Sequence, residues 1–249
     1  MYRLNLRFIF IITVYSILTL LAIIISLSPL TYYSYFVLQS KDYLYYLSFP
    51  VIGLLFWLIS FMIFVTIHGR LISRFFLPQI KEGSYPLKSR TNLIYSIRLS
   101  ADNIAKYWCN TFEIIPFLTQ LYLNKVFLSA YEVKFGKNTY IAIEVRIDGI
   151  LLIEFGDNVF IDHRTIVGAH INHDSDELGG NILYKHVKVW NNCFIGYNAG
   201  LIPDVKMGNK SVLGANSVAL LNVDIPENET WVGMPAKFMK KNGNSKIQY

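Results

Sequence analysis

Small apolar residues return every six positions over residues 133–235, in the C-terminal half of the chain. They form three runs, which are Phe135, Ile141, Ile147 and Ile153, then Phe155, Ile161 and Val167, then Val189, Ile195, Leu201, Met207 and Leu213. A period of six fits neither an amphipathic α-helix nor an alternating β-strand. It indicates a left-handed parallel β-helix, in which three six-residue sides complete one eighteen-residue coil and one residue per side points at the axis.

A second set of small or β-branched residues lies two positions before the first, as expected for the same interior. It comprises Thr139, Val145, Leu151, Val159, Thr165, Val187, Cys193, Ala199, Val205 and Ser211. Glycines such as Gly136, Gly156 and Gly196 directly follow apolar residues of the first set. We expect these glycines at the corners, where the backbone must turn tightly. The pattern therefore predicts a hexapeptide-repeat β-helix over residues 131–249.

Two long apolar stretches precede the repeats. Residues 8–27 contain no charge and match the length that crosses a hydrocarbon core of ~30 Å. Residues 44–67 form a second stretch, which a cleaved signal peptide would not explain. The sequence therefore predicts a membrane α-helical hairpin within residues 1–78, followed by an all-β domain.

The distribution of charge supports a membrane location. The chain is 53% hydrophobic and 16% charged, and its net charge is +6. Residues 1–130 carry eleven Lys and Arg against four Asp and Glu, whereas residues 131–249 carry twelve against thirteen. A basic excess confined to the hydrophobic half suits an anionic membrane surface better than nucleic acid.

Basic residues also predict the orientation of the hairpin. Arg3 and Arg7 precede the first stretch, and Arg70 and Arg74 follow the second, whereas the expected loop over residues 28–43 contains only Lys41. Cytoplasmic flanks of membrane spans are enriched in Lys and Arg. We therefore expect an integral membrane protein of the cell membrane, with both termini and the β-helix on the cytoplasmic side.

Residues 79–130 mix polar and apolar positions, with prolines as breakers. Residues 92–108 and 117–127 are typical of amphipathic helices. Such helices could lie in the membrane interface or pack on the β-helix as ordinary helices, and the sequence leaves both open. We treat residues 79–130 as a membrane-proximal helical segment.

The six-residue pattern is interrupted once, over residues 169–186. This polar loop contains three of the five histidines of the chain, His170, His173 and His186. Loops expelled from a repeat shaft are where function concentrates. Cys193, by contrast, occupies an inward position, and we expect a buried thiol there.

The residues of this loop and of the coils after it resemble the hexapeptide-repeat acyltransferases. The resemblance is carried by residues 170–174 (HINHD), 190–196 (WNNCFIG), 214–217 (GANS) and 233–237 (GMPAK). The spacing to the second motif places His170 at the position of the catalytic histidine of that family. The coils and the preceding membrane helices are also similar to membrane-embedded regions at the carboxyl end of some non-ribosomal peptide synthetases.

Acyl transfer from a thioester to a hydroxyl or amine requires a base with a pKa near neutrality, which histidine supplies. We expect His170 to be this base and Asp174 or Asp176 to orient its other ring nitrogen. A backbone amide or Asn191 is a candidate donor to the oxyanion. No nucleophile for an acyl-enzyme is evident.

The resemblance also implies a donor and an assembly. The donor is expected to be acyl-CoA or another phosphopantetheine thioester, bound at subunit interfaces of a homotrimer. The residues expected to contact it are Gly196, Ala199, Ala215 and Lys237. Residues 220–222 (LLN) lack the basic residue that many relatives have there, so Lys237, Lys240 and Lys241 are the cations expected to hold the phosphates.

The membrane anchor favours a lipid or lipid-linked acceptor, and His173 and His186 are candidates to bind this substrate. A non-catalytic, membrane-anchored scaffold is the main alternative. A zinc-dependent hydratase of the carbonic-anhydrase type would need three histidines on neighbouring coils. The histidine spacing in this chain lacks that pattern, so the sequence predicts no metal site.

Overall fold

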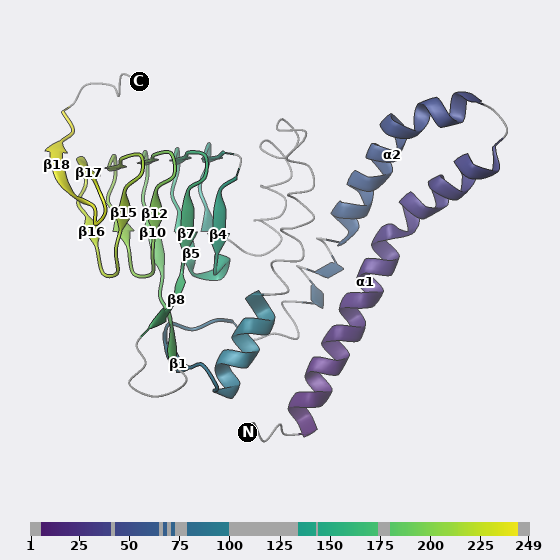
Figure 1. The fold of residues 1–249 in the computed structure, drawn as a ribbon, viewed down its shortest axis with the longest axis horizontal. Helices are drawn as coiled ribbons and strands as arrows, with labels where there is room; N and C mark the ends of the chain where they lie inside the picture. Colours follow the sequence, from purple (N-terminus) through teal and green to yellow (C-terminus); the bar gives the residue numbers. More distant parts are fainter. Residues whose placement is uncertain are drawn as a thin grey trace.

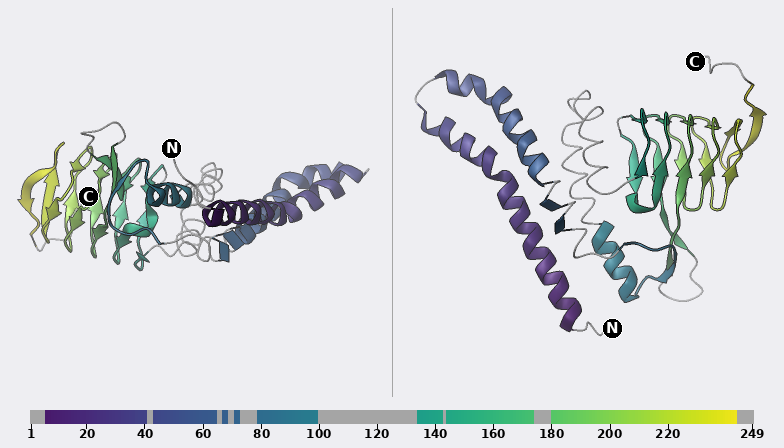
Figure 2. Two further views of the ribbon diagram at one scale, coloured as in Figure 1. Left: turned by 90° about the horizontal axis from the view of Figure 1, so that it is seen from below. Right: turned by 180° about the vertical axis from the view of Figure 1, so that it is seen from behind.

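A computed structural model describes residues 6–40, 43–64, 67–68, 71–72, 79–99, 134–142, 144–173 and 180–243. The molecule is elongated, with a pair of helices at one end and a β-solenoid at the other (Figures 1 and 2). The first coil of the solenoid lies nearest the helices, and the last coil is the farthest from them.

The helices α1 (Leu6–Gln39) and α2 (Tyr43–Phe64) lie side by side and antiparallel (Figure 1). The expected loop over residues 28–43 is therefore wrong, because α1 continues through Pro29 to Gln39. Proline is tolerated in apolar helices, where leaving the helix would expose many unpaired backbone groups to hydrocarbon. The two helices contact each other through rings such as Tyr33 and Phe56, which stack at 4.9 Å.

Apolar side chains of both helices point away from protein. Phe10 is 69% exposed, Ile24 65% and Leu44 69%. Exposure of this kind is costly in water and suits a lipid environment. Among the described residues, one helix, over Thr13–Gln39, is long and apolar enough to cross a membrane, and the apolar part of α2, Pro50–Phe64, is shorter.

Three parallel sheets form the sides of the solenoid. The first contains β2 (Lys134–Phe135), β5 (Ile153–Phe155), β10 (Val187–Val189), β13 (Lys206–Met207) and β16 (Asp224–Ile225). The second contains β3 (Tyr140–Ile141), β6 (Phe160–Ile161), β11 (Phe194–Ile195), β14 (Val212–Leu213), β17 (Glu229–Val232) and β18 (Lys237–Lys241), of which β18 is antiparallel. The third contains β4 (Arg146–Asp148), β7 (Ile166–Gly168), β12 (Gly200–Leu201) and β15 (Val218–Ala219). The predicted β-helix is therefore confirmed, with about four coils.

The periodic apolar residues stack in register inside the shaft. Phe155 pairs with Val189, and Ile161 with Ile195. Ile153 departs from the predicted run, because it pairs with Val187 and so occupies the second inward position. A 3-10 turn, η3 (Ile150–Leu152), lengthens this corner by two residues and shifts the register.

The corners are built by two kinds of residue. Left-handed backbone recurs every six residues from residue 192 to residue 228, at Asn192, Asn198, Asp204, Lys210, Asn216, Asn222 and Asn228. The expected role of the glycines is different, because Gly196 and Gly208 do not have positive φ. A Cβ at Gly208 would lie 2.5 Å from the backbone nitrogen of Glu227. These glycines therefore allow successive coils to approach closely, and asparagine supplies most of the left-handed turns.

The single interruption of the coils is a β-hairpin of β8 (His170–His173) and β9 (Asn181–Tyr184). A strand from far earlier in the chain, β1 (Gly83–Pro86), pairs with β9 to complete a three-stranded antiparallel sheet (Figure 1). Residues 83–86 therefore form a strand within the segment expected to be helical. Residues 90–99 are helical, and residues 100–133 lie outside the described part of the chain.

Candidate functional site

His170 begins β8 at the corner where the chain leaves the third sheet. It pairs with Tyr184 across the hairpin, and the two rings stack with centroids 5.8 Å apart and planes 24° from parallel. Tyr184 is fully buried. One face of the imidazole is therefore covered by a fixed aromatic ring.

Burial lowers the pKa of His170, and the charge of Asp148 opposes this shift. The Nδ1 atom is buried and has no hydrogen-bond partner among the described residues. It faces Gly149, where an added Cβ would lie 3.3 Å from it. Burial thus favours the neutral imidazole, and because Nδ1 is buried, Nε2 is the candidate nitrogen for proton transfer.

Tyr184 is held by side chains from outside the solenoid. Its hydroxyl donates a hydrogen bond of 2.8 Å to Oδ1 of Asn92. The rings of Tyr85 and Tyr95 meet it edge-on at 6.0 and 5.3 Å. Burial raises the pKa of Tyr184 to about 12, so the phenol stays neutral.

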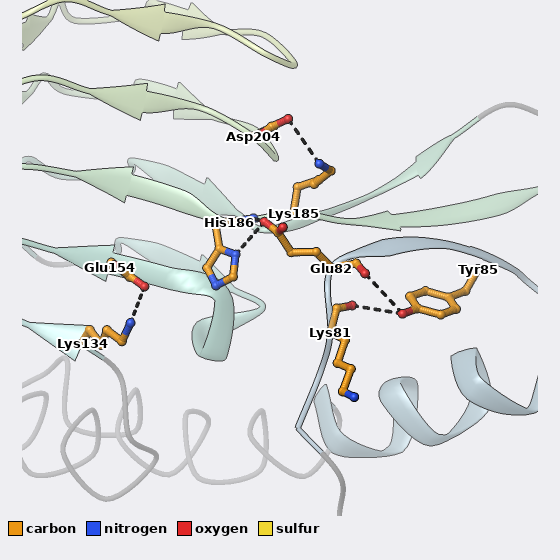
Figure 3. A network of polar contacts seen from close by, with 8 residues as sticks. All are labelled: Lys81, Glu82, Tyr85, Lys134, Glu154, Lys185, His186 and Asp204. Carbon is orange, nitrogen blue, oxygen red and sulfur yellow. Dashed lines mark hydrogen bonds and ion pairs between the residues drawn. The ribbon is translucent and has the colours of Figure 1, made fainter.

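His186 follows the hairpin and is paired with Glu82 (Figure 3). Oε1 of Glu82 lies 2.6 Å from Nδ1 of His186 and accepts the backbone N–H of the same residue at 3.0 Å. These bonds lower the pKa of Glu82, the backbone bond most strongly. A cavity of about 590 Å³ adjoins the pair, and its described lining residues are Gln79, Ile80, Lys81, Glu82, Lys134, Leu151, Leu152 and His186.

The other predicted residues of the loop are placed less fully. Asp174 and Asp176 lie outside the described residues, and of His173 the structure describes only its place in β8. Asn191 lies at the corner between β10 and β11. There its Oδ1 accepts the N–H of Asp157 at 2.8 Å, as part of the ladder that joins the coils. Within one chain, Asn191 and His170 therefore occupy different corners.

The predicted donor contacts lie along a third corner, between the second and third sheets. Gly196 and Ala215 are adjacent there, since a Cβ at Gly196 would lie 2.5 Å from the nitrogen of Ala215. Lys237 is exposed on β18 and pairs with Val232. Ala199 is 1% exposed, so within one chain it offers almost no surface to a ligand. A single chain does not bring this corner to His170.

The structure adds Glu82, Asn92 and Tyr184 to the surroundings of the histidines. Glu82 and Asn92 contact residues about ninety to a hundred positions away, and no periodic pattern in the sequence predicts contacts over such a separation. Tyr184 lies in the loop that the sequence singled out, and the alternation of Ile182 and Tyr184 is the one available signal of a strand there.

A metal centre has no support in the described residues, since no group of three or more His, Cys, Asp and Glu side chains is placed to hold an ion there. Cys193 is buried, as predicted, and burial raises its pKa, which makes it a poor nucleophile.

No family model matches the chain. It is 28% identical over 109 residues to a galactoside O-acetyltransferase of Escherichia coli strain K12, which covers 43% of this chain and 52% of that protein. It is 33% identical over 78 residues to the mitochondrial gamma carbonic anhydrase 2 of Arabidopsis thaliana, over 29% of this chain and 28% of that protein. The chain thus spans about half the length of the first of these relatives, and less of the second.

A crystal structure of a maltose O-acetyltransferase from Clostridium difficile 630 superposes with a TM-score of 0.51 and 19% identity, over 66% of this chain and 94% of that one. At this identity the match shows the fold alone.

Proposed function

We propose that this chain, which is similar to the hexapeptide-repeat acetyltransferases in sequence and fold, is a membrane-bound acyltransferase. It transfers an acyl group, with acetyl the first to test, from CoA or a related thioester to a hydroxyl or amine. The acceptor is a lipid or lipid-linked molecule. The observation that carries this proposal is the neutral, partly buried His170 at the single break in the coils.

In this reaction Nε2 of His170 removes the proton of the acceptor hydroxyl or amine as its oxygen or nitrogen attacks the thioester carbonyl carbon. The new bond forms while the carbonyl electrons move onto oxygen, giving a tetrahedral oxyanion. The carbonyl re-forms, the carbon–sulfur bond breaks, and the imidazolium returns the proton to the departing thiolate. The products are the acylated acceptor and the free thiol, and no acyl-enzyme is needed.

The separation of His170 from the corner of Gly196 and Ala215 supports a shared site. In a homotrimer, the hairpin of one subunit can face that corner of the next, as heterologous contacts in cyclic assemblies allow. Lys237 on the same corner supplies a cation for the phosphates of CoA. We therefore place the donor between subunits.

The membrane acceptor is supported by the helices. Apolar side chains such as those of Phe10 and Ile24 are exposed on these helices, which suits insertion into a bilayer. The first coil of the solenoid lies next to the helices, so the hairpin that carries His170 would lie close to this bilayer. Cytoplasmic orientation rests on the basic flanks of the helices. A soluble acceptor would gain nothing from such an anchor.

The test is thiol release from acetyl-CoA by purified protein in detergent, with and without membrane lipid extract. Wild type is expected to release thiol only with extract, and His170→Ala to lose about 10²–10⁴-fold in rate. Glu227→Ala is the control, because Glu227 is exposed at a corner between the first and second sheets, away from His170 and from the corner of Gly196 and Ala215, and it should keep wild-type turnover. Equal turnover of soluble sugars would exclude the lipid acceptor, and turnover by His170→Ala would exclude the base.

A further inference from the structure

Residues 79–99 follow the membrane helices, yet they contact the hairpin that carries His170. We call residues 79–99 the linker. Its strand β1 is an outer strand of the sheet β1-β9-β8, so the linker supports β9 from the side opposite to β8. The N–H of Leu87 extends this contact by donating to the carbonyl of Gly180 at 2.9 Å. The candidate base thus lies on a hairpin held by a segment from outside the solenoid.

Tyr184 connects the linker to the imidazole. On β9 it pairs with Gly83 on one side and with His170 on the other. Its ring stacks on the imidazole, and its hydroxyl donates to Asn92 of the helix over residues 90–99.

Asn92 is itself fixed in orientation. Its Nδ2 donates to the carbonyl of Leu87 at 3.0 Å, and its backbone N–H donates to Oγ of Ser89 at 3.1 Å. With Nδ2 engaged, Oδ1 is the atom presented to Tyr184. Asn92 is 3% exposed, so losing this partner would leave a buried polar group unpaired.

This arrangement matters because no hydrogen bond holds Nδ1 of His170 among the described residues. Packing against Tyr184 is therefore what fixes the plane of the imidazole. Proton transfer depends on that plane, since a displacement of 1 Å in an active site can cost about 10²-fold in rate.

We propose that Asn92 and Tyr184 are positioning residues, through which the linker after the membrane helices sets the orientation of the His170 imidazole. This inference rests on the proposed function, in which His170 is the base. It assigns part of the catalytic geometry to residues outside the β-helix, so the solenoid alone is an incomplete site.

The charged and titratable groups around the imidazole are few. Asp148 of β4 favours the imidazolium. Tyr184 of β9, Tyr85 of β1 and Tyr95 of the helix lie behind the ring. Burial raises the pKa of Tyr85 as well as that of Tyr184, so these two phenols stay neutral while His170 titrates.

The first test compares Tyr184→Leu with wild type. We expect kcat to fall at least about 10-fold, with KM for acetyl-CoA unchanged within about twofold, because only the base is displaced. The midpoint of His170 titration, followed by histidine NMR, should rise as water reaches the exposed ring face. His170 titration does not depend on turnover, so it also decides the inference if the wild type transfers no acyl group.

The second test is a double-mutant cycle of Tyr184→Phe and Asn92→Leu. Tyr184→Phe leaves Oδ1 of Asn92 unpaired, whereas Asn92→Leu removes the acceptor of the Tyr184 hydroxyl and also the Nδ2 donor to the carbonyl of Leu87. We expect each change to lower kcat about 3- to 10-fold. The double variant removes both partners of the Tyr184–Asn92 bond, so its kcat should be no lower than that of Asn92→Leu alone. Tyr15→Phe is the matched control, since Tyr15 is buried and bonds His68 at 2.9 Å in the helical part, and it should keep wild-type kcat.

A purely structural role would give a different result. The variants would then lose activity only in proportion to their folded fraction, measured by thermal unfolding, and the His170 titration would match wild type. Three results would each overturn the inference. These are activity losses that match the loss of folded protein, a His170 titration that matches wild type, and additive losses in the double-mutant cycle.

Discussion

Asn198 and Asn216 show how single residues maintain the coils. Both have left-handed backbone, with φ of 54° and 53°, and Nδ2 of Asn198 donates to Oδ1 of Asn216 at 2.9 Å. Asparagine suits this position because it tolerates left-handed φ and bonds its counterpart in the next coil. The sequence analysis assigned the tight turns to the glycines, because the six-residue pattern alone does not separate a left-handed turn from a close approach of two coils.

The glycines give a paired prediction at this scale. Gly208→Ala should lower the free energy of unfolding by about 1–3 kcal/mol, because the new Cβ would meet the backbone of the next coil at 2.5 Å. Gly168→Ala is the control. Its nearest atom is 3.9 Å away, so stability should stay unchanged or rise by up to about 1 kcal/mol. Thermal unfolding of both variants measures the difference, and equal losses would contradict the close-approach explanation.

His170 gives a prediction for pH. Its pKa in the folded protein lies below the ordinary 6.5, so the base form persists to lower pH than for a free histidine. The acid limb of kcat/KM should therefore lie below 6.5, with more than half of the plateau rate remaining at pH 6.5. A pH profile of acetyl transfer measures this limb, and a midpoint above 6.5 would be inconsistent with a desolvated imidazole.

At the scale of elements, the sequence predicted the solenoid well and the hairpin sheet poorly. Paired residues in the coils, such as Phe194 and Val212, lie eighteen residues apart, so the repeating pattern itself predicts which strands pair. β1 pairs with a strand about a hundred residues later and has only four residues. Local patterns cannot specify such a pairing, which depends on where the solenoid places β9.

The contact of Glu82 with His186 should control how tightly β1 holds this sheet. Glu82→Gln keeps an acceptor for the N–H of His186 but loses the charge. We therefore expect faster hydrogen exchange of the β9 amides at pH 7. Glu144→Gln is the control, because its ion pair with Arg164 lies at a coil corner, and exchange in β9 should be unaffected.

The contact of Glu82 with His186 has a defined pH window. The folded pKa of Glu82 is lowered, so its contribution is present above the unfolded value of 4.5 and is lost as the pH falls through the folded pKa. After correction for intrinsic exchange rates, wild type and Glu82→Gln should differ at pH 7 and converge once the pH falls below the folded pKa of Glu82, which lies under 4.5. A difference that persists there would point to a role of Glu82 other than its charge.

For the whole molecule, the decisive feature is that His170 and the corner of Gly196 and Ala215 lie apart in one chain. If sites form between subunits, His170→Ala and Lys237→Glu subunits should complement each other. Random mixing at a 1:1 ratio makes about a quarter of the interfaces intact, so about a quarter of wild-type turnover should return. Mixed preparations in detergent measure this recovery. No recovery, with both subunits in one assembly, would place each site within a single chain.

The pairing of β1 with β9 also sets an order of events during synthesis. β1 leaves the ribosome soon after the N-terminal helices α1 and α2, but its partner strand is translated about a hundred residues later. At about 5–20 residues per second, β1 waits roughly 5–20 s before the sheet can close. Nascent or truncated chains that end before β9 therefore lack this sheet, and under the proposed function they would reach the membrane before the surroundings of His170 are assembled.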